Sequence, residues 1–347
     1  MEKHENHYFQ HEGKVIEDPH FKHVMALTLD PTSDYRRGVL RCITSRTGDP
    51  GVKGNVDRSE LHLVSGNSSE HFEVGKRLDL KNADEIVAEL DGEEWDFLGL
   101  EDPDIIIDPD TGLMHLYFTM PFKSVDPTKE EGIVHLGHAV GKDLDSLEMT
   151  MPAIRGDLKN GAKELSVAPK SKSGIRHNLV ESSIVEDGVY YSTVRVADAE
   201  DLGQPWKLGE TIFHPKEMGI KWADGHASPA ALFSRDFIDV GDGKMLGLLN
   251  GRGANRVVEG EIVYDPFRIG LFIYDYENGK IDWVSPEPLI EDSEAKNITF
   301  ASQWVETGHG EGVLYAHVDD SFVRAYTLKA EDLRSLLLKW YGIDPRI

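Results

Sequence analysis

The sequence predicts an all-β fold, a five-bladed β-propeller with a short C-terminal helix, and three observations support this prediction. One pattern recurs along the chain: a strand-like apolar run leads through a turn with Gly or Asp to a second apolar or aromatic run. Each repeat has room for about four short strands, the arrangement of a propeller blade. Helical periodicity is scarce over the 347 residues. The turn glycines, which we expect at positive φ, are Gly38, Gly112, Gly188, Gly243 and Gly312.

The repeats follow one another along the chain, and other strand-like stretches such as residues 268–284 lie between them. No low-complexity segment or obvious linker divides the sequence, so we expect a single domain over residues 1–347, with residues 1–20 as an N-terminal extension. A β-sandwich with long insertions is the alternative, because the repeat is imperfect. The strand pairs of the five repeats are predicted at residues 23–45, 104–120, 181–196, 228–251 and 299–318.

The last predicted element is the helix. Leu333, Leu336 and Leu337 follow one another at i, i+3 and i+4 spacing, which places all three on one helical face. The sequence therefore predicts a short helix over residues 328–340, with this face toward the core.

The charge of the chain restricts its partners. With 37 basic and 62 acidic residues the formal net charge is −25, so the phosphates of nucleic acids and anionic membranes would be repelled. No apolar run approaches the ~20 residues that cross a bilayer, and the polar N-terminus has no apolar signal core. Cys42 is the only cysteine and has no partner for an internal disulfide. We therefore expect a cytoplasmic protein without a nucleic-acid or membrane partner.

Polar residues stand near the predicted innermost strands of several repeats, where a propeller points them into its central funnel. Carboxyl groups at one funnel are typical of glycosidases, because one protonates the leaving oxygen while another activates water or attacks the sugar. Each has a structural alternative: an Asp-Pro turn, a solvated strand edge or a hydrogen-bonded core histidine. Trp95, Trp222 and Trp304 lie near these segments and would suit stacking on sugar rings. The candidates are Glu101, Asp102, Glu181, Asp224, His226 and Asp320.

Other chemistries are not indicated. The segment with His226 has no second histidine at metal-binding spacing, so we expect no metal site. There is no phosphate-binding loop of the GxxxxGK[ST] or strand-linked GxGxxG type, and no GxSxG elbow. Cys42 has no sequence context of a nucleophile. We therefore expect no cofactor.

Several motifs together resemble glycoside hydrolase family 130. GLEDPDI resembles the family's Gly-x-Glu-Asp-Pro-Arg-Ile motif, and similar segments follow in order from HNLVESSIVEDGVYYSTVRV to VLYAHVDDSFVRAYTLKAEDLRSLL. The similarity runs from about residue 60 to residue 340. It implies a five-bladed propeller, since members of that family have this fold and many are β-mannoside phosphorylases. Families 43 and 32 share the propeller and are the neighbouring possibilities.

The resemblance also implies roles for single residues. Asp102 matches the catalytic aspartate that donates the proton, Glu101 matches its neighbour, and Asp320 matches an aspartate that contacts the sugar. Arg195 aligns with the arginine of a His-Arg-Pro-like strand, whereas the match of Asp224 and His226 is loose because that motif has changed. One departure is clear: Asp104 stands where the family has an arginine.

The reaction depends on what attacks the sugar. Phosphorolysis needs cations around the phosphate, and Asp104 would repel it. A hydrolase needs a carboxylate that activates water, for which Glu181 is the candidate; in an inverting enzyme it would lie ~6.5–9.5 Å from Asp102. The expectation is a glycoside hydrolase acting on a short oligosaccharide or β-mannoside. A phosphorylase with inorganic phosphate as co-substrate and a non-catalytic sugar-binding propeller are the alternatives, and the oligomeric state stays open. The residues for a phosphate pocket would be Arg176, His177, Arg195 and Lys221.

Overall fold

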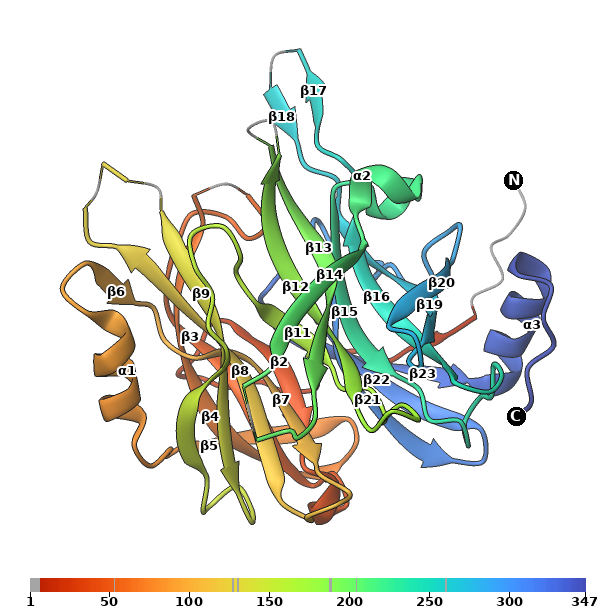
Figure 1. The fold of residues 1–347 in the computed structure, drawn as a ribbon, viewed down its shortest axis with the longest axis horizontal. Helices are drawn as coiled ribbons and strands as arrows, with labels where there is room; N and C mark the ends of the chain where they lie inside the picture. Colours follow the sequence, from red (N-terminus) through yellow and green to blue (C-terminus); the bar gives the residue numbers. More distant parts are fainter. Residues whose placement is uncertain are drawn as a thin grey trace.

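Antiparallel strand pairing organises most of the chain, so the prediction of a mostly β protein is confirmed. Figure 1 shows the strands as groups that follow one another in chain order, from the red N-terminal to the blue C-terminal part. No helix in the described part of the chain is long and apolar enough to cross a membrane. The structure, a computed structural model, describes residues 7–347 apart from residues 53, 127, 130, 187, 188, 204 and 260.

The first half of the chain forms two sheets. In the first, four strands pair in chain order, β2-β3-β4-β5, and in the second β8 lies between β9 and both β6 and β7. Successive strands are joined by hairpins, which keeps each sheet local in sequence. The strands are β2 (Val24–Leu29), β3 (Arg37–Thr47), β4 (Val56–Ser68), β5 (His71–Arg77), β6 (Trp95–Phe97), β7 (Glu101–Ile107), β8 (Met114–Ser124), β9 (Gly132–Gly141) and β10 (Glu148–Ile154).

The second half begins with an eight-stranded sheet that consists of two four-stranded groups. The groups are joined only by a parallel pairing of Ser192 with His226, so each keeps its own hairpin order. A short two-stranded hairpin, β17-β18, projects from the second group at the top of Figure 1. The strands are β11 (Lys163–Ser166), β12 (Arg176–Glu186), β13 (Val189–Ala199), β14 (Lys207–Phe213), β15 (His226–Leu232), β16 (Lys244–Arg252), β17 (Arg256–Val258), β18 (Glu261–Val263), β19 (Phe267–Asp275) and β20 (Lys280–Val284).

The last sheet joins the two ends of the chain. Strand β1 (Phe9–Gln10) pairs with β23 (Phe322–Lys329), and Figure 1 shows this red strand beside the blue C-terminal sheet. Val15 and Ile16 are buried against the same sheet. Part of the segment expected to be an N-terminal extension therefore completes a sheet. The remaining strands of this sheet are β21 (Thr299–Gly308) and β22 (Glu311–Val318).

The predicted C-terminal helix is confirmed as α3 (Ala330–Trp340). Leu333, Leu336 and Leu337 are buried in an apolar cluster with residues of β16, β19, β22 and β23, as their spacing predicted. Burying each leucine contributes about 1.5–3 kcal/mol, so packing rather than helical propensity holds this short element. The other helices of the described residues are α1 (Ala83–Asp91) and α2 (Pro215–Met218), with 3₁₀ turns at Pro31–Ser33 and Lys221–Ala223.

The prediction of positive φ at the turn glycines is wrong for two of them. Gly112 and Gly243 have positive φ, but Gly38 lies inside β3 and Gly312 inside β22. A Cβ at Gly38 would come within 2.2 Å of the Thr28 carbonyl oxygen, and one at Gly312 within 2.2 Å of the Trp304 ring. These two glycines therefore allow close packing rather than a turn. Gly188 lies outside the described residues.

The first strands of the successive groups meet one another. Strand β2 contacts β7, β7 contacts β11, β11 contacts β15, β15 contacts β21, and β21 contacts β2. Three of these strands carry a residue in the left-handed region where the pairing register shifts: Ala26 (φ 50°), Asp102 (φ 46°) and Glu164 (φ 44°). Such bulges redirect a side chain out of the regular alternation of a strand. They give this ring of first strands two acidic residues at equivalent places.

Candidate active site

Asp102 and Glu101 share one buried guanidinium. Arg41 of β3 donates from Nη1 to Asp102 Oδ1 at 2.9 Å and from Nη2 to Glu101 Oε1 at 2.5 Å, while its Nε donates to Ser59 at 2.9 Å. Burial opposes the charge of Arg41, but Asp102 and Glu101 outweigh it and hold its pKa above the usual range. The bulge in β7 is what lets two adjacent residues reach the same side chain, because adjacent strand residues otherwise point to opposite faces.

The pKa of Glu101 lies near neutrality. Burial raises it to about 7; the charge of Asp102 adds to the effect, and Arg41 opposes it. A carboxyl group ionises less easily when a second carboxylate lies close to it. Glu101 therefore titrates in the pH range where most enzymes work.

A second charged group surrounds Glu181. Its Oε1 lies 3.3 Å from Lys163 Nζ and 3.2 Å from His226 Nε2, and the carboxyl is fully enclosed. Burial opposes its charge, but Lys163 and His226 outweigh burial and lower the pKa of Glu181 well below its usual value. Burial lowers the pKa of His226 despite the carboxylate beside it. Glu181 is thus a permanently ionised anchor for Lys163.

Glu164 is a site residue that the sequence reasoning missed. It follows Lys163 at the start of β11, as Asp102 follows Glu101 at the start of β7, and both residues occupy the bulge. Burial, followed by the charge of Asp102, raises the pKa of Glu164 well above its usual value. The sequence carries little signal for it, because β11 has only four residues and lies outside the predicted repeats.

Asp102 and Glu164 line one small cavity of about 20 Å³, in the ring of first strands. Residues of β2, β7, β11, β15 and β21 all contribute to its wall, and His317 of β22 closes it. Glu181 does not belong to this wall. Lys163, whose Nζ lies 3.3 Å from Glu181 Oε1, also responds to the charges of Glu164 and Asp102. The other described wall residues are Ala26, Pro103, Asp104, Leu165, Ala230, Ala301 and Ser302.

Asp320 joins this charged cluster from the last sheet. Its Oδ1 lies 3.2 Å from His317 Nε2, and its backbone oxygen accepts from Arg46 Nη2 at 3.0 Å. Burial would raise the pKa of Asp320, but His317, Arg41 and Arg46 together hold it below its usual value. Of the residues predicted from sequence, the structure therefore brings together Glu101, Asp102, Glu181, His226 and Asp320.

The other predicted residues lie in separate surroundings. Arg176, at the start of β12, donates to the Ala168 carbonyl at 2.9 Å, and His177 pairs with Asp198 at 2.6 Å. Arg195 in β13 donates to the Gly209 carbonyl of β14 at 2.9 Å. Asp224 accepts from the Ala254 amide at 2.6 Å and lies 3.2 Å from the exposed Lys221. Strands β11 and β12 are antiparallel, so the start of β12, with Arg176 and His177, lies at the other end of the pair from Lys163 and Glu164. The predicted phosphate pocket of Arg176, His177, Arg195 and Lys221 therefore does not assemble.

Of the three tryptophans expected to stack on sugars, Trp222 belongs to the core, and Trp95 and Trp304 are partly buried beside apolar clusters. Trp222 is buried and donates to the Ser285 carbonyl at 2.9 Å. Trp304 packs edge-on against Phe233, and Trp95 packs on the apolar cluster of the first two sheets. No three His, Cys, Asp or Glu side chains among the described residues are arranged to hold a metal ion.

The pKa of Asp104 provides a test of whether water reaches this cavity. Burial raises the pKa of Asp104 to about 7 from its ordinary 3.8, so the folded state keeps a proton that the unfolded chain releases in this range. The proton bound by Asp104 therefore stabilises the folded state fully below pH 4, and this stabilisation is lost as the pH rises toward 7. Because Asp104→Asn cannot ionise, we expect it to gain about 1–3 kcal/mol of stability relative to wild type between pH 5 and pH 8. Urea unfolding at both pH values measures this difference.

The matched control is Asp110→Asn, in the exposed turn after the same strand. It should show no such pH-dependent gain. An Asp104→Asn variant whose stability relative to wild type is the same at pH 5 and pH 8 would show that Asp104 is hydrated and ionises normally.

No protein-family profile and no curated protein sequence matches this chain. Solved structures do match. The β-1,2-mannobiose phosphorylase from Listeria innocua aligns over 97% of this chain and 99% of its own, with a TM-score of 0.65 and 12% identity. A glycosyl hydrolase from Bacteroides ovatus aligns over 89% and 85%, with a TM-score of 0.58 and 16% identity. A mannose phosphorylase from Leishmania mexicana aligns over 93% and 88%, with a TM-score of 0.53 and 13% identity.

This chain has the fold of these enzymes. The resemblance to glycoside hydrolase family 130 that the motifs indicated is thereby confirmed at the level of the fold. At identities of 12–16% the likeness does not extend to substrate or reaction. The reaction has to be inferred from the charged cluster around Asp102 instead.

Proposed function

We propose that the chain is a five-bladed β-propeller enzyme that cleaves a glycosidic bond of an oligosaccharide, most simply by hydrolysis. The observation that carries this proposal is the shared cavity of Asp102 and Glu164, placed by equivalent bulges in two first strands. The names of the structural neighbours, which include glycosyl hydrolases and mannoside phosphorylases, support a carbohydrate substrate. Acid–base chemistry of this kind needs no cofactor.

The strand groups support the blade count. Each half of the eight-stranded sheet forms one blade, because a single bridge between described residues joins the halves, and the three other sheets of four or five strands form one blade each. The closed ring of first strands then surrounds the central axis. Strand β1 supplies the outer strand of the last blade and so ties the N-terminal part to the C-terminal part.

Two of the three carboxyls that line the cavity divide the work of acid and base. Burial, followed by the charge of Asp102, raises the pKa of Glu164 well above its usual value, which makes its carboxylate a strong proton acceptor. In our assignment Asp102 donates a proton to the leaving oxygen, and Glu164 receives the proton of the attacking water. Glu101 and Arg41 position Asp102. Asp320, Lys163 and His226 hold sugar hydroxyls, and the enclosed Glu181 keeps Lys163 and His226 in place.

Glu164 replaces Glu181 as our candidate base for two reasons. Glu181 does not line the cavity that Asp102 lines, and its strongly lowered pKa makes it a weak proton acceptor. We expect Glu164→Gln to lower kcat about 10²–10⁴-fold with little change in stability, because an uncharged side chain suits this buried place.

Glu181→Gln is the matched comparison. It removes the carboxylate that pairs with Lys163, whose side chain is 35% exposed and can still reach water, so we expect a loss of about 1–3 kcal/mol in unfolding free energy. Steady-state kinetics together with urea unfolding of both variants separates the roles. A Glu164→Gln enzyme with wild-type kcat, or a Glu181→Gln enzyme with wild-type stability and a large loss of kcat, would restore Glu181 as the base.

Phosphorolysis is the second candidate, because two cations, the buried Arg41 and the partly exposed Lys163, interact with the charge of Asp102. Product analysis on manno-, gluco- and arabino-oligosaccharides, with and without inorganic phosphate, distinguishes the reactions. Free sugar without phosphate indicates a hydrolase, and sugar 1-phosphate formed only with phosphate indicates a phosphorylase. Binding without either product would indicate a sugar-binding propeller that lacks catalysis.

A further inference from the structure

A surface pocket of about 880 Å³ lies beside the candidate active site, between the first and the last sheet. Its walls come from the segment that leads into β2, the end of β3 with the loop after it, and the loops before β21 and after β22. Pockets of this size hold drug-sized or disaccharide-sized ligands. Nothing in the proposed catalytic steps uses it.

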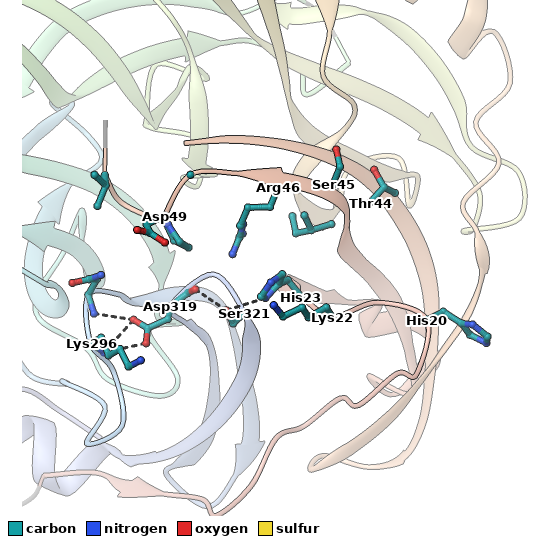
Figure 2. A pocket seen from close by; sticks show the side chains of 15 residues that line it. His20, Lys22, His23, Thr44, Ser45, Arg46, Asp49, Lys296, Asp319 and Ser321 are labelled. Atoms are coloured by element: carbon teal, nitrogen blue, oxygen red, sulfur yellow. Dashed lines mark hydrogen bonds between the residues drawn. The ribbon is translucent and has the colours of Figure 1, made fainter. Parts of the chain in front are cut away.

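The pocket gathers cations on a chain that is otherwise strongly acidic. Lys22 and Lys296 form no ion pair with a described carboxylate, and His20 and His23 add two imidazoles. In Figure 2 the side chains of Arg46 and Lys22 reach into the pocket from different walls, and Lys296 lies at its edge. With 62 acidic against 37 basic residues in the whole chain, this local excess of cations is the reverse of the general trend.

One N–H donor of Arg46 has no hydrogen-bond acceptor among the described residues. Its Nε and Nη2 each donate to Asp57 at 2.7 Å, and Nη2 also donates to the Asp320 carbonyl. Its Nη1 is buried and has no hydrogen-bond partner among the described residues, although the side chain is nine-tenths buried. A buried N–H of a guanidinium without an acceptor is destabilising. An acceptor oxygen from a ligand would remove this cost.

The pocket's carboxylates do not cancel these cations. Asp319 accepts hydrogen bonds from the backbone amides of Lys296, Asn297 and Ile298 at 2.8–3.1 Å, so three N–H groups compensate its charge. Asp49 is the other carboxylate of the wall. The two lysines and the free Arg46 donor therefore suit an anion.

The pocket connects to the candidate active site through ion pairs. Arg46 holds Asp57, whose Oδ2 lies 3.8 Å from Arg41 Nη2, and Arg41 holds Asp102. The described residues of the pocket wall include neither Glu101 nor Asp102. Asp57 and Arg41 thus stand between Arg46 of the pocket and Asp102, which fits an anionic substituent carried elsewhere on the substrate better than an attacking anion.

We propose that this pocket binds an anionic group, a phosphate ester or a carboxylate, on the saccharide that the enzyme cleaves. That the ligand is a saccharide rests on the proposed function. That it carries an anionic group rests on Lys22, Lys296 and Arg46. It predicts that the natural substrate is a phosphorylated or uronic-acid-containing saccharide rather than a neutral one.

Isothermal titration calorimetry tests the pocket without requiring turnover. The probes are a hexose, the same hexose carrying a 6-phosphate, and the corresponding hexuronate, each titrated into wild type and the Lys22→Gln/Lys296→Gln double variant. We expect at least one charged sugar to bind wild type about tenfold or more tightly than the neutral hexose, and the double variant to lose this preference. The control, Lys76→Gln/Lys142→Gln, removes two exposed lysines elsewhere and should bind as wild type does.

Comparison of the three sugars identifies the kind of anion that the pocket binds. Preference for the phosphate alone indicates a phosphate ester, preference for the uronate alone indicates a carboxylate, and preference for both indicates recognition of charge; each supports the proposal. Equal affinity for the neutral and charged sugars, or an undiminished preference in the double variant, overturns it. Neutral oligosaccharides cleaved without any charge preference would leave the proposed function standing, whereas charged sugars bound by an enzyme that cleaves nothing would leave only the pocket.

Discussion

Asp102→Asn is expected to lower kcat/KM by about 10³-fold or more while the protein stays folded. The variant loses the proton that the leaving oxygen needs, and general acid catalysis of this kind contributes about 10²–10⁴-fold. The substitution is conservative in shape, and asparagine tolerates the left-handed backbone that residue 102 adopts. Arg41 keeps Glu101 as a partner at 2.5 Å, so no buried cation is left alone.

The measurement is steady-state kinetics on the saccharide that product analysis identifies, accompanied by urea unfolding. Asp110→Asn is the control, because it removes a carboxylate from the exposed turn that follows the same strand and loses only a surface ion pair with Lys170. Its activity should match that of wild type. A fully active Asp102→Asn enzyme would remove Asp102 from the mechanism and leave Asp104 and Glu164 as the acids of the cavity.

A substrate whose leaving group needs no proton sharpens this result. Aryl glycosides with acidic phenols leave without protonation, so Asp102→Asn should lose much less activity on them than on an oligosaccharide. A loss of equal size on both substrates would indicate that Asp102 acts on the sugar ring or as a base rather than as a proton donor.

The position of Asp102 could be predicted because local sequence determines it. Asp-Pro at the start of an apolar run places the residue at the entry of a strand, and the family motif names the same residue. Glu164 escaped notice because its strand has only four residues and no apolar run announces it. Its bulge is a tertiary feature, visible only once β11 lies between β7 and β15.

Glu181 shows the opposite error. The sequence places it beside an apolar run, as a residue that leads into a strand. The structure instead puts it in the middle of β12, paired across the sheet with Lys163 and Val194, in the second strand of its group rather than the first. Composition alone does not tell which strand of a repeat is innermost, since all four carry alternating or continuous apolar residues.

The prediction of positive φ at the turn glycines was wrong for a related reason. A glycine between two apolar runs signals a turn, but it also appears where another backbone or ring approaches a strand closely. Gly38 and Gly312 serve the second purpose, and the reversal before Gly38 uses Asp34 and Tyr35 in left-handed conformations instead. Only the contact of Gly38 with the Thr28 carbonyl, which lies across the sheet, reveals this.

Arg41→Met is expected to cost about 3–5 kcal/mol of unfolding free energy at pH 8 and to abolish activity. Arg41 is the buried cation between Glu101, Asp102 and Asp57, and removing one partner of a buried ionic cluster leaves the others as unpaired charges. The loss should be smaller at pH 5. Without Arg41 the pKa of Glu101 moves further above its present value of about 7, so at pH 5 the carboxyl is neutral and needs no cation.

The control is Arg58→Met on the neighbouring strand β4. Arg58 pairs with Asp96, but its side chain is 45% exposed, so its removal should cost no more than about 1 kcal/mol and should not depend on pH between 5 and 8. Chemical unfolding of wild type and both variants at the two pH values gives all the differences. If Arg41→Met unfolds like Arg58→Met at pH 8, water already reaches the three carboxyls and the cluster is an open funnel. If it loses stability mainly at pH 8, Arg41 is the group that lets Glu101 ionise beside Asp102.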